Sequence, residues 1–114
     1  MKLPEAEKAV VPRRKIVDYL LDLAHPDGGP KAAFFLRFGF TAEAWHRMAA
    51  GLKQHAVQNE VGKVVENKLG TRYSVEGELE TPDGRNPLVR TIWFIANDET
   101  VPRFVTAYPK RGRR

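Results

Sequence analysis

Hydrophobic and polar residues alternate along the second half of the chain in a pattern that predicts β-strands. Residues 71–79 follow the two-residue period of a strand that has one face in water. Residues 88–95 are hydrophobic at nearly every position, which is typical of a central strand covered on both sides. A shorter run follows at 104–108, and residues 60–70 are compatible with an edge strand or a loose connection. The turns between these runs are too short for crossover connections, so we expect an antiparallel meander.

The last run also predicts how its side chains divide between the two faces of the sheet. Strict alternation places Phe104, Thr106 and Tyr108 on one face, and Val105 and Ala107 on the other. Two polar groups are therefore expected side by side on one face of the final strand.

The first half of the chain carries hydrophobic residues at helical spacing. This spacing predicts helices over residues 13–24, 31–38 and 41–58, with Thr41 as the N-cap of the third. Residues 25–30 include prolines and glycines that cannot continue a helix, so we expect a loop there. The residues expected in the core are Phe34, Phe38, Trp45, Leu52, Val75 and Ile92.

Helices followed by strands indicate an α+β fold, in which three N-terminal helices pack on one face of a three- or four-stranded antiparallel sheet. The chain has 114 residues, of which 42% are hydrophobic, so it is long enough for one core and too short for two ordinary domains. We therefore expect one domain over residues 1–109 and a basic tail over residues 110–114.

The expected tail dominates the charge of the chain. The formal net charge is +5, and the four cations within residues 110–114 account for all but +1 of it. Such a tail attracts phosphate in a salt-dependent way without supplying specificity or catalysis, and it is equally compatible with a solvated chain end.

The composition of the chain excludes several kinds of catalytic and metal site and indicates where in the cell the protein acts. Cysteine is absent, which excludes disulfides, a thiol nucleophile and a cysteine-based zinc site. The three histidines, at positions 25, 46 and 55, do not have metal-ligand spacing, so we expect no metal and no cofactor. No stretch approaches the roughly 18 consecutive apolar residues of a membrane span, and the N-terminus lacks the apolar segment of a signal peptide. We therefore expect a cytoplasmic protein without membrane association.

Two polar residues in the helical half are candidates for catalysis. His25 lies in the expected loop, where an imidazole can stand at the mouth of a cleft and act as a general acid or base near neutral pH. Lys31 lies in the first turn of a helix, where the helix dipole disfavours a cation, so its position indicates an anionic partner. The structural alternatives are a loop histidine without a role and a solvated lysine.

Three polar residues on the strands complete the candidate catalytic set. Arg90 interrupts a hydrophobic strand, where a guanidinium must reach a carboxylate, a phosphate or open solvent. An ion pair with Glu76 or Glu78 across the hairpin is the structural alternative. Thr106 and Tyr108 could bind a phosphate or position a base, and they could also serve only as good strand formers.

Four further residues are assigned to substrate contacts. Arg72 and Thr91 are polar positions within the strand runs, and Lys110 and Arg111 begin the basic tail. Together with the catalytic set they supply a proton carrier, cations and hydroxyl groups. These are the groups that cleavage of a phosphodiester without a metal requires.

Several short segments together resemble a family of small bacterial domains of unknown function, and the resemblance covers nearly the whole chain. The order of helices and strands is in turn similar to the barnase, EndoU, colicin and RelE-like ribonucleases. The segments that carry the family resemblance are residues 2–11, Tyr19-Leu-Leu, His25-Pro-Asp-Gly, Lys31-Ala-Ala-Phe-Phe, Gly39-Phe-Thr, Gly70-Thr-Arg-Tyr, Val89-Arg-Thr-Ile-Trp and the closing residues 102–109.

The resemblance implies a toxin-like domain that cleaves RNA without a metal, by attack of the 2′-hydroxyl on the adjacent phosphate, and a partner protein that neutralises it. The chain departs from the barnase pattern because no histidine lies on a predicted strand. A looser arrangement of the RelE-like type, built from Lys31, Arg72, Arg90 and Tyr108, is implied instead, and it leaves the base and the acid unassigned. The leading hypothesis is thus a small bacterial ribonuclease-like toxin, and the alternative is a non-catalytic module that binds protein or nucleic acid.

Overall fold

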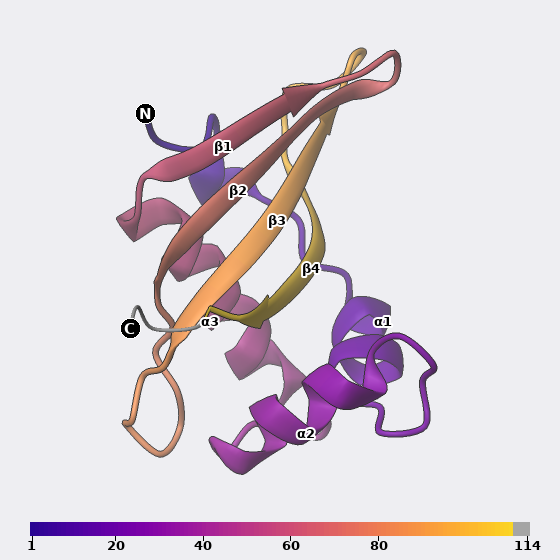
Figure 1. The fold of residues 1–114 in the computed structure, drawn as a ribbon, viewed down its shortest axis with the longest axis vertical. Helices are drawn as coiled ribbons and strands as arrows, with labels where there is room; N and C mark the ends of the chain where they lie inside the picture. The colour runs from indigo at the N-terminus through magenta and orange to yellow at the C-terminus, as the bar shows by residue number, and fades with distance from the viewer. Residues whose placement is uncertain (111–114) are drawn as a thin grey trace.

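The computed structural model describes residues 1–110 and places three helices before a four-stranded sheet, so the predicted α+β fold is confirmed (Figure 1). A short helix of 3-10 type, η1, precedes the others, and the helix α1 continues directly into a π-helical turn, η2. The elements are η1 (Ala6–Lys8), α1 (Arg13–Lys15), η2 (Ile16–Leu20), α2 (Gly29–Arg37), α3 (Trp45–Gln58), β1 (Val61–Glu66), β2 (Gly70–Glu78), β3 (Leu88–Ala96) and β4 (Arg103–Pro109).

The four strands form one antiparallel sheet in the order β1-β2-β3-β4, which is the predicted meander. Residues 60–70 contribute its edge strand β1 and are not a loose connection. In the register of the sheet, Glu76 lies opposite Arg90, and Arg90 lies opposite Tyr108. Three polar side chains from three neighbouring strands are therefore brought into one row.

The N-terminal segment pairs with the start of β4. An isolated parallel bridge joins Val10 to Arg103. The N–H of Val10 donates to the carbonyl oxygen of Pro102 at 2.9 Å, and the N–H of Phe104 donates to the carbonyl oxygen of Val10 at 2.9 Å. This bridge satisfies backbone groups at the start of an edge strand that would otherwise be open to another chain.

The helices cover one face of the sheet and leave the other face open. In Figure 1, α3 passes behind the strands, whereas α1 and α2 lie together beside β4. The expectation that residues 88–95 are covered on both sides is therefore wrong. Ile92 faces the open side and lines a concavity there, although only 8% of its surface is exposed.

The first helix is shorter than predicted and changes its winding. After the single turn of α1, the N–H of Leu21 donates to the carbonyl oxygen of Ile16 at 2.8 Å, which is the five-residue spacing of a π-helix. Ile16, Leu20 and Leu21 are buried by this turn. Hydrophobic spacing does not reveal such a turn, because α and π windings can bury the same residues.

The other two helices also begin at different residues than predicted. α2 begins at Gly29, so that Pro30 occupies its first turn. α3 begins at Trp45 and not at residue 41. Thr41 still caps a turn just ahead of it, because its Oγ1 accepts the N–H of Ala44 at 3.2 Å.

The core is built around a different aromatic residue than expected. Phe35 is completely buried, together with the expected residues Leu52 and Val75. Phe34, Phe38 and Trp45 are only half-buried at the margin of the core. α2 therefore turns Phe35 inward, and Phe34 packs at the edge of the hydrophobic cluster.

A β-bulge in β4 corrects the predicted division of side chains between the faces. Ile92 pairs with Thr106 while Trp93 pairs with Phe104, so Val105 is an extra residue in β4. The bulge turns Phe104 to the helix-covered face, where its ring packs against Trp93 at 5.4 Å between centroids. Thr106 stays on the opposite face, so the two are not on one face as strict alternation predicted.

A closed hydrogen-bond network joins α3 to β3 inside the core. Nε1 of Trp93 donates to Thr91 Oγ1 at 2.8 Å, and Thr91 Oγ1 lies 3.2 Å from Nδ1 of His55. Nε2 of His55 lies 3.0 Å from the carbonyl oxygen of Val89. Carbonyl oxygens only accept, so Nε2 carries a proton and Nδ1 accepts from the Thr91 hydroxyl. The network is therefore complete with a neutral histidine.

Replacing Phe35 by Ala should lower the free energy of unfolding by about 3 to 5 kcal/mol, because it removes a fully buried ring and leaves a cavity. The neighbouring substitution Phe34→Ala should cost clearly less, since that ring is already half-exposed. Denaturant unfolding of both variants measures the difference. Equal losses would contradict the inward orientation of Phe35.

The free energy of unfolding should decrease as the pH falls below about 6.5, because of His55. Burial, the strongest influence, lowers the pKa of His55 from its ordinary 6.5, although its hydrogen bonds to Val89 and Gly77 act in the opposite direction. The unfolded chain then binds this proton at a higher pH than the folded chain, so stability is full above 6.5 and declines below it. Denaturant midpoints across this range provide the measurement. His55→Gln should flatten the decline and the exposed control His46→Gln should keep it, and an unchanged decline in His55→Gln would refute the assignment.

Candidate active site

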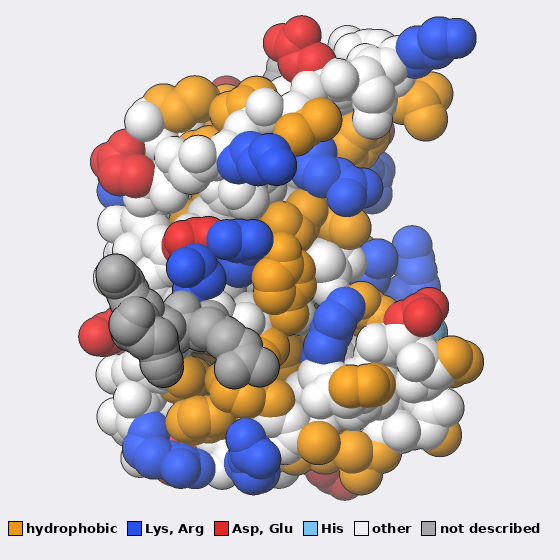
Figure 2. Space-filling view, in the orientation of Figure 1, with side chains coloured by type: hydrophobic (Ala, Val, Ile, Leu, Met, Phe, Trp, Pro, Cys, Tyr) orange, Lys and Arg blue, Asp and Glu red, His pale blue; other side chains and the backbone are white. Residues whose placement is uncertain are grey.

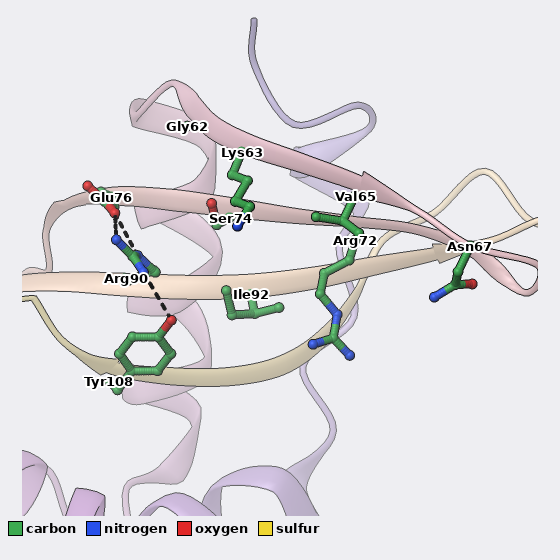
Figure 3. Close-up of a pocket in the computed structure, with 10 residues that line it drawn as sticks. All are labelled: Gly62, Lys63, Val65, Asn67, Arg72, Ser74, Glu76, Arg90, Ile92 and Tyr108. Atoms are coloured by element: carbon green, nitrogen blue, oxygen red, sulfur yellow. Dashed lines mark hydrogen bonds and ion pairs between the residues drawn. The ribbon is translucent and has the colours of Figure 1, made fainter.

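The open face of the sheet is hollowed into a concavity of about 650 Å³. Side chains from all four strands line it, and Figure 3 shows them projecting from the same face. Among the described residues, the charged side chains that line it are three cations, Lys63, Arg72 and Arg90, and a single carboxylate, Glu76. Lys and Arg side chains gather over these strands in the space-filling view (Figure 2). The concavity is thus suited to a negatively charged ligand.

Arg90 lies between Glu76 on β2 and Tyr108 on β4 (Figure 3). Its Nε donates to Oε2 of Glu76 at 2.6 Å, its Nη2 forms an ion pair with the same oxygen, and its Nη1 donates to Tyr108 Oη at 3.3 Å. The hydrogen bond to Tyr108, and then the one to Glu76, raise the pKa of Arg90 above its ordinary value. Of the two carboxylates weighed as partners, Glu76 is the one that pairs with Arg90, and Glu78 lies opposite Leu88.

A second polar cluster lies where the helices meet the edge of the sheet. Lys31 in the first turn of α2 donates from Nζ to Tyr19 Oη at 2.7 Å and to Thr106 Oγ1 at 3.1 Å. The hydroxyl groups of Tyr19 and Thr106 are 2.8 Å apart. One ammonium and two hydroxyl groups, from α2, η2 and β4, therefore form a triangle of hydrogen bonds.

The surroundings of Tyr19 favour its ionised form. Burial would by itself raise the pKa of the phenol, but the hydrogen bonds from Lys31 and Thr106 and the charges of Lys31 and Lys15 outweigh burial and lower it from 10.0. Lys15 is fixed nearby, because its Nζ donates to the carbonyl oxygen of Val105 at 2.9 Å. Tyr19 is thus placed to lose its proton more readily than an ordinary tyrosine.

The two clusters are joined through the ring of Tyr108. Nζ of Lys31 lies 6.0 Å from the ring centroid, and Cζ of Arg90 lies 5.7 Å from it. Lys31 therefore contacts Tyr19, Thr106 and Tyr108, and Tyr108 contacts Arg90. We call these five residues the β4 band. Of the five residues predicted as catalytic, the structure brings Lys31, Thr106, Tyr108 and Arg90 into one connected group.

His25, the fifth residue predicted as catalytic, lies beside the β4 band, and one of its ring nitrogens is already hydrogen-bonded to the backbone. Its ring meets the ring of Tyr19 edge-on, at 5.0 Å between centroids. Nδ1 of His25 accepts the N–H groups of Asp27 at 3.0 Å and Gly28 at 2.9 Å, which holds the loop in shape. An imidazole that accepts at Nδ1 carries its proton on Nε2, so His25 is a hydrogen-bond donor in this arrangement. Neither ring nitrogen of His25 is then left with a free lone pair.

The residues predicted to contact substrate have different locations. Arg72 is exposed in the concavity, and Lys110 lies at its border, with Nζ 3.8 Å from Glu76 Oε1. Thr91, which was assigned to substrate contacts, does not lie in the concavity. It is completely buried on the helix-covered face, where its hydroxyl completes the His55 network and cannot reach a substrate. Arg111 lies outside the described residues.

Tyr19 is the residue that sequence reasoning missed. It lies among the hydrophobic residues of the predicted helix over residues 13–24, so the pattern indicates a core residue. The available signal was Lys15 four residues earlier, since this spacing places a cation and a phenol on one helical face. The structure confirms their proximity, with Lys15 Nζ 5.4 Å from the Tyr19 ring centroid.

Within residues 1–110, no group of three or more His, Asp and Glu side chains is arranged to hold a metal ion. No helix in the same range is long and apolar enough to cross a membrane.

Residues 2–111 match the sequence profile of the family described as "Domain of unknown function (DUF6883)", so the chain belongs to this family. The predicted resemblance to a family of domains of unknown function is confirmed by this match. No protein with a curated description matches the sequence.

The fold is also found in a solved structure described as "Contact-dependent growth inhibition toxin - immunity protein complex from Klebsiella pneumoniae 342". The alignment covers 89% of this chain and 99% of that chain, with a TM-score of 0.71 and 19% sequence identity. At this identity the likeness shows a common fold. The predicted similarity to barnase, EndoU, colicin and RelE-like ribonucleases stays a prediction.

Thr91→Val should destabilise the protein by about 1 to 3 kcal/mol, because it leaves Nε1 of Trp93 buried without an acceptor. Thr106→Val is the matched control and should cost less, since the site of Thr106 is half-exposed and water can replace the lost hydroxyl. Denaturant unfolding of the two variants tests the contrast. A larger loss for Thr106→Val would show that the wrong threonine has been assigned to the core.

Proposed function

We propose that this DUF6883 domain is a bacterial toxin module that cleaves RNA without a metal ion, on the β4 band. The observation that carries the proposal is the series of contacts in which Lys31 donates to Thr106 and lies near the ring of Tyr108, and Tyr108 in turn accepts from Arg90. This series presents two cations and two hydroxyl groups beside an open, cationic concavity. Such groups can bind a phosphodiester and stabilise the charge that develops when it reacts.

The positions of the two cations support phosphate binding at the ring of Tyr108. In metal-free RNA cleavage the 2′-hydroxyl attacks the adjacent phosphorus, and negative charge accumulates on the phosphate oxygens. Lys31 and Arg90 both lie within about 6 Å of this ring, so a phosphate beside it would be close to both. Arg72, and the tail residues Lys110 and Arg111, would add salt-dependent attraction for neighbouring phosphates. His25 would contribute a hydrogen-bond donor at the mouth of the site.

The toxin assignment is supported by the shared fold and by charge. The structure from Klebsiella pneumoniae 342 contains a growth inhibition toxin with its immunity protein, and we extend that arrangement to this domain by analogy. A protein that neutralises the domain by covering the concavity would have to be acidic there, because three cations face one carboxylate. The net charge of +5 fits the toxin better than the antagonist of a cationic nuclease. We place its action on RNA in the cytoplasm.

A non-catalytic module that binds nucleic acid or protein is the second candidate function. The ion pair between Arg90 and Glu76 favours it, because a carboxylate already occupies one side of the guanidinium. A binding module would use the same concavity but would not need the cluster of Lys31, Tyr19 and Thr106. Variants of Lys31 therefore separate the two functions.

Expression of the domain should arrest bacterial growth and fragment cellular RNA, and the purified protein should cleave RNA in the presence of a chelator. Lys31→Met and Arg90→Gln should each lower the rate of cleavage by about 10²- to 10³-fold, because each removes a cation from the reacting phosphate. His25→Ala should also lower the rate. Growth curves, RNA electrophoresis and thermal melting provide the readouts.

The matched control is Arg103→Gln, which removes an exposed arginine that pairs with Glu99, away from the β4 band. This variant should remain fully active. Co-expression of the product of the neighbouring gene should restore growth if that gene encodes the neutralising partner. RNA that is bound but left intact by the wild-type protein would favour the binding module, and folded Lys31→Met and Arg90→Gln variants with full activity would place the catalytic site elsewhere.

A further inference from the structure

We propose that Tyr19 is the general base of this site, and that its phenolate oxygen removes the proton from the 2′-hydroxyl of the RNA strand that is cut. The inference rests on the proposed function and assigns the proton acceptor that the sequence left open. Tyr19 lies on η2 and borders the hollow between the helices and β4, together with His25 and Thr106.

Counting donors and acceptors shows why the oxygen of Tyr19 can accept a proton. An ammonium only donates, so Lys31 gives one hydrogen to Tyr19 and another to Thr106. The hydroxyl of Thr106 accepts from Lys31 and is then free to donate its own hydrogen to Tyr19, 2.8 Å away. Oη of Tyr19 thus receives two hydrogen bonds from fixed groups, and neither of them needs the phenolic proton. The arrangement is complementary to a phenolate.

The charged groups around Tyr19 mainly favour its phenolate form. Lys15 and Lys31 are the cations closest to its ring, at 5.4 and 5.1 Å from the centroid, and they help to lower the pKa of the phenol. Two carboxylates, Asp18 and Asp27, border the same hollow. Among the described residues, neither of them forms a hydrogen bond or an ion pair with Tyr19. The remaining charged or titratable groups at the hollow are Arg14 and His25.

His25 is a weaker acceptor in the same location. Its Nδ1 already accepts two backbone N–H groups, and its Nε2 carries the proton. Neither ring nitrogen therefore offers a free lone pair to a 2′-hydroxyl group unless the loop gives up both hydrogen bonds. Tyr19 requires no such change, because its two donors remain in place in both protonation states.

The proposed step is a transesterification at the phosphate. The phenolate takes the 2′-hydroxyl proton, the O2′–P bond forms, and the P–O5′ bond breaks. The departing 5′-oxygen takes a proton from water, and the hydroxide that remains removes the proton gained by Tyr19. The products are a 2′,3′-cyclic phosphate and a free 5′-hydroxyl, and Tyr19 returns to its initial state.

The test compares Tyr19→Phe with Tyr73→Phe, which makes the same chemical change in a tyrosine that packs against the core. Tyr19→Phe should lower kcat for RNA cleavage by about 10²- to 10⁴-fold with little change in KM, and Tyr73→Phe should not. The wild-type rate should rise with pH, and the midpoint of this rise should lie below the ordinary tyrosine pKa of 10.0. Thr106→Val, which removes one donor to the phenolate, should move this rise to higher pH.

Ultraviolet absorbance of tyrosinate gives a readout that does not depend on RNA. One of the three tyrosines should titrate below the other two, and this titration should be lost in Tyr19→Phe and shifted to higher pH in Lys31→Met. Wild-type cleavage that persists undiminished in a folded Tyr19→Phe variant would overturn this inference alone. The absence of a low-titrating tyrosine would also overturn it, whereas a wild-type protein that cleaves no RNA would remove both the inference and the proposed function.

Discussion

The extra residue in β4 is the constraint on which the rest of the candidate site depends. Without the bulge at Val105, alternation would place Phe104 on the same face as Thr106. The bulge lets Phe104 pack in the core against Trp93 while Thr106 stays on the other face of the edge strand, where it contacts Lys31 and Tyr19. A single residue therefore reconciles a packed core with a polar edge.

The domain contains two polar hydrogen-bond networks. One is fully buried, and the other borders a hollow at the surface. The network of His55, Thr91 and Trp93 is closed: every donor has an acceptor, and no group in it is exposed. The triangle of Lys31, Tyr19 and Thr106 is also connected, but it borders a hollow, and its central oxygen receives two donors without using its own proton. The first network joins α3 to the sheet, and the second lies where the proposed function places the substrate.

The fold could be predicted from the sequence because the spacing of hydrophobic residues reveals the helices and strands, and their order along the chain indicates the fold class. The site depends on local details that leave no periodic pattern in the sequence. Alternation identified the strands, but it cannot show where one extra residue inverts the faces. Arg90 and Thr91 looked alike as polar interruptions of one strand, and because neighbours on a strand point to opposite faces, one lies in the concavity and the other in the core. The π-helical turn that carries Tyr19 is invisible for a similar reason, since its hydrophobic residues keep a helical spacing.

The pair of Arg90 and Glu76 shows how the site could remain folded while waiting for a ligand. Its side chains keep 34% and 37% of their surface exposed, so water screens their attraction, and such pairs contribute about 0 to 1 kcal/mol. A phosphate could therefore replace the carboxylate at the guanidinium at small cost, and so could an acidic side chain of a neutralising protein. Glu76 would then move toward Lys110, whose Nζ already lies 3.8 Å from its other oxygen. In the proposed function, the carboxylate of Glu76 would thus hold the place of an incoming anion, and the same exchange would admit either the substrate or the inhibitor.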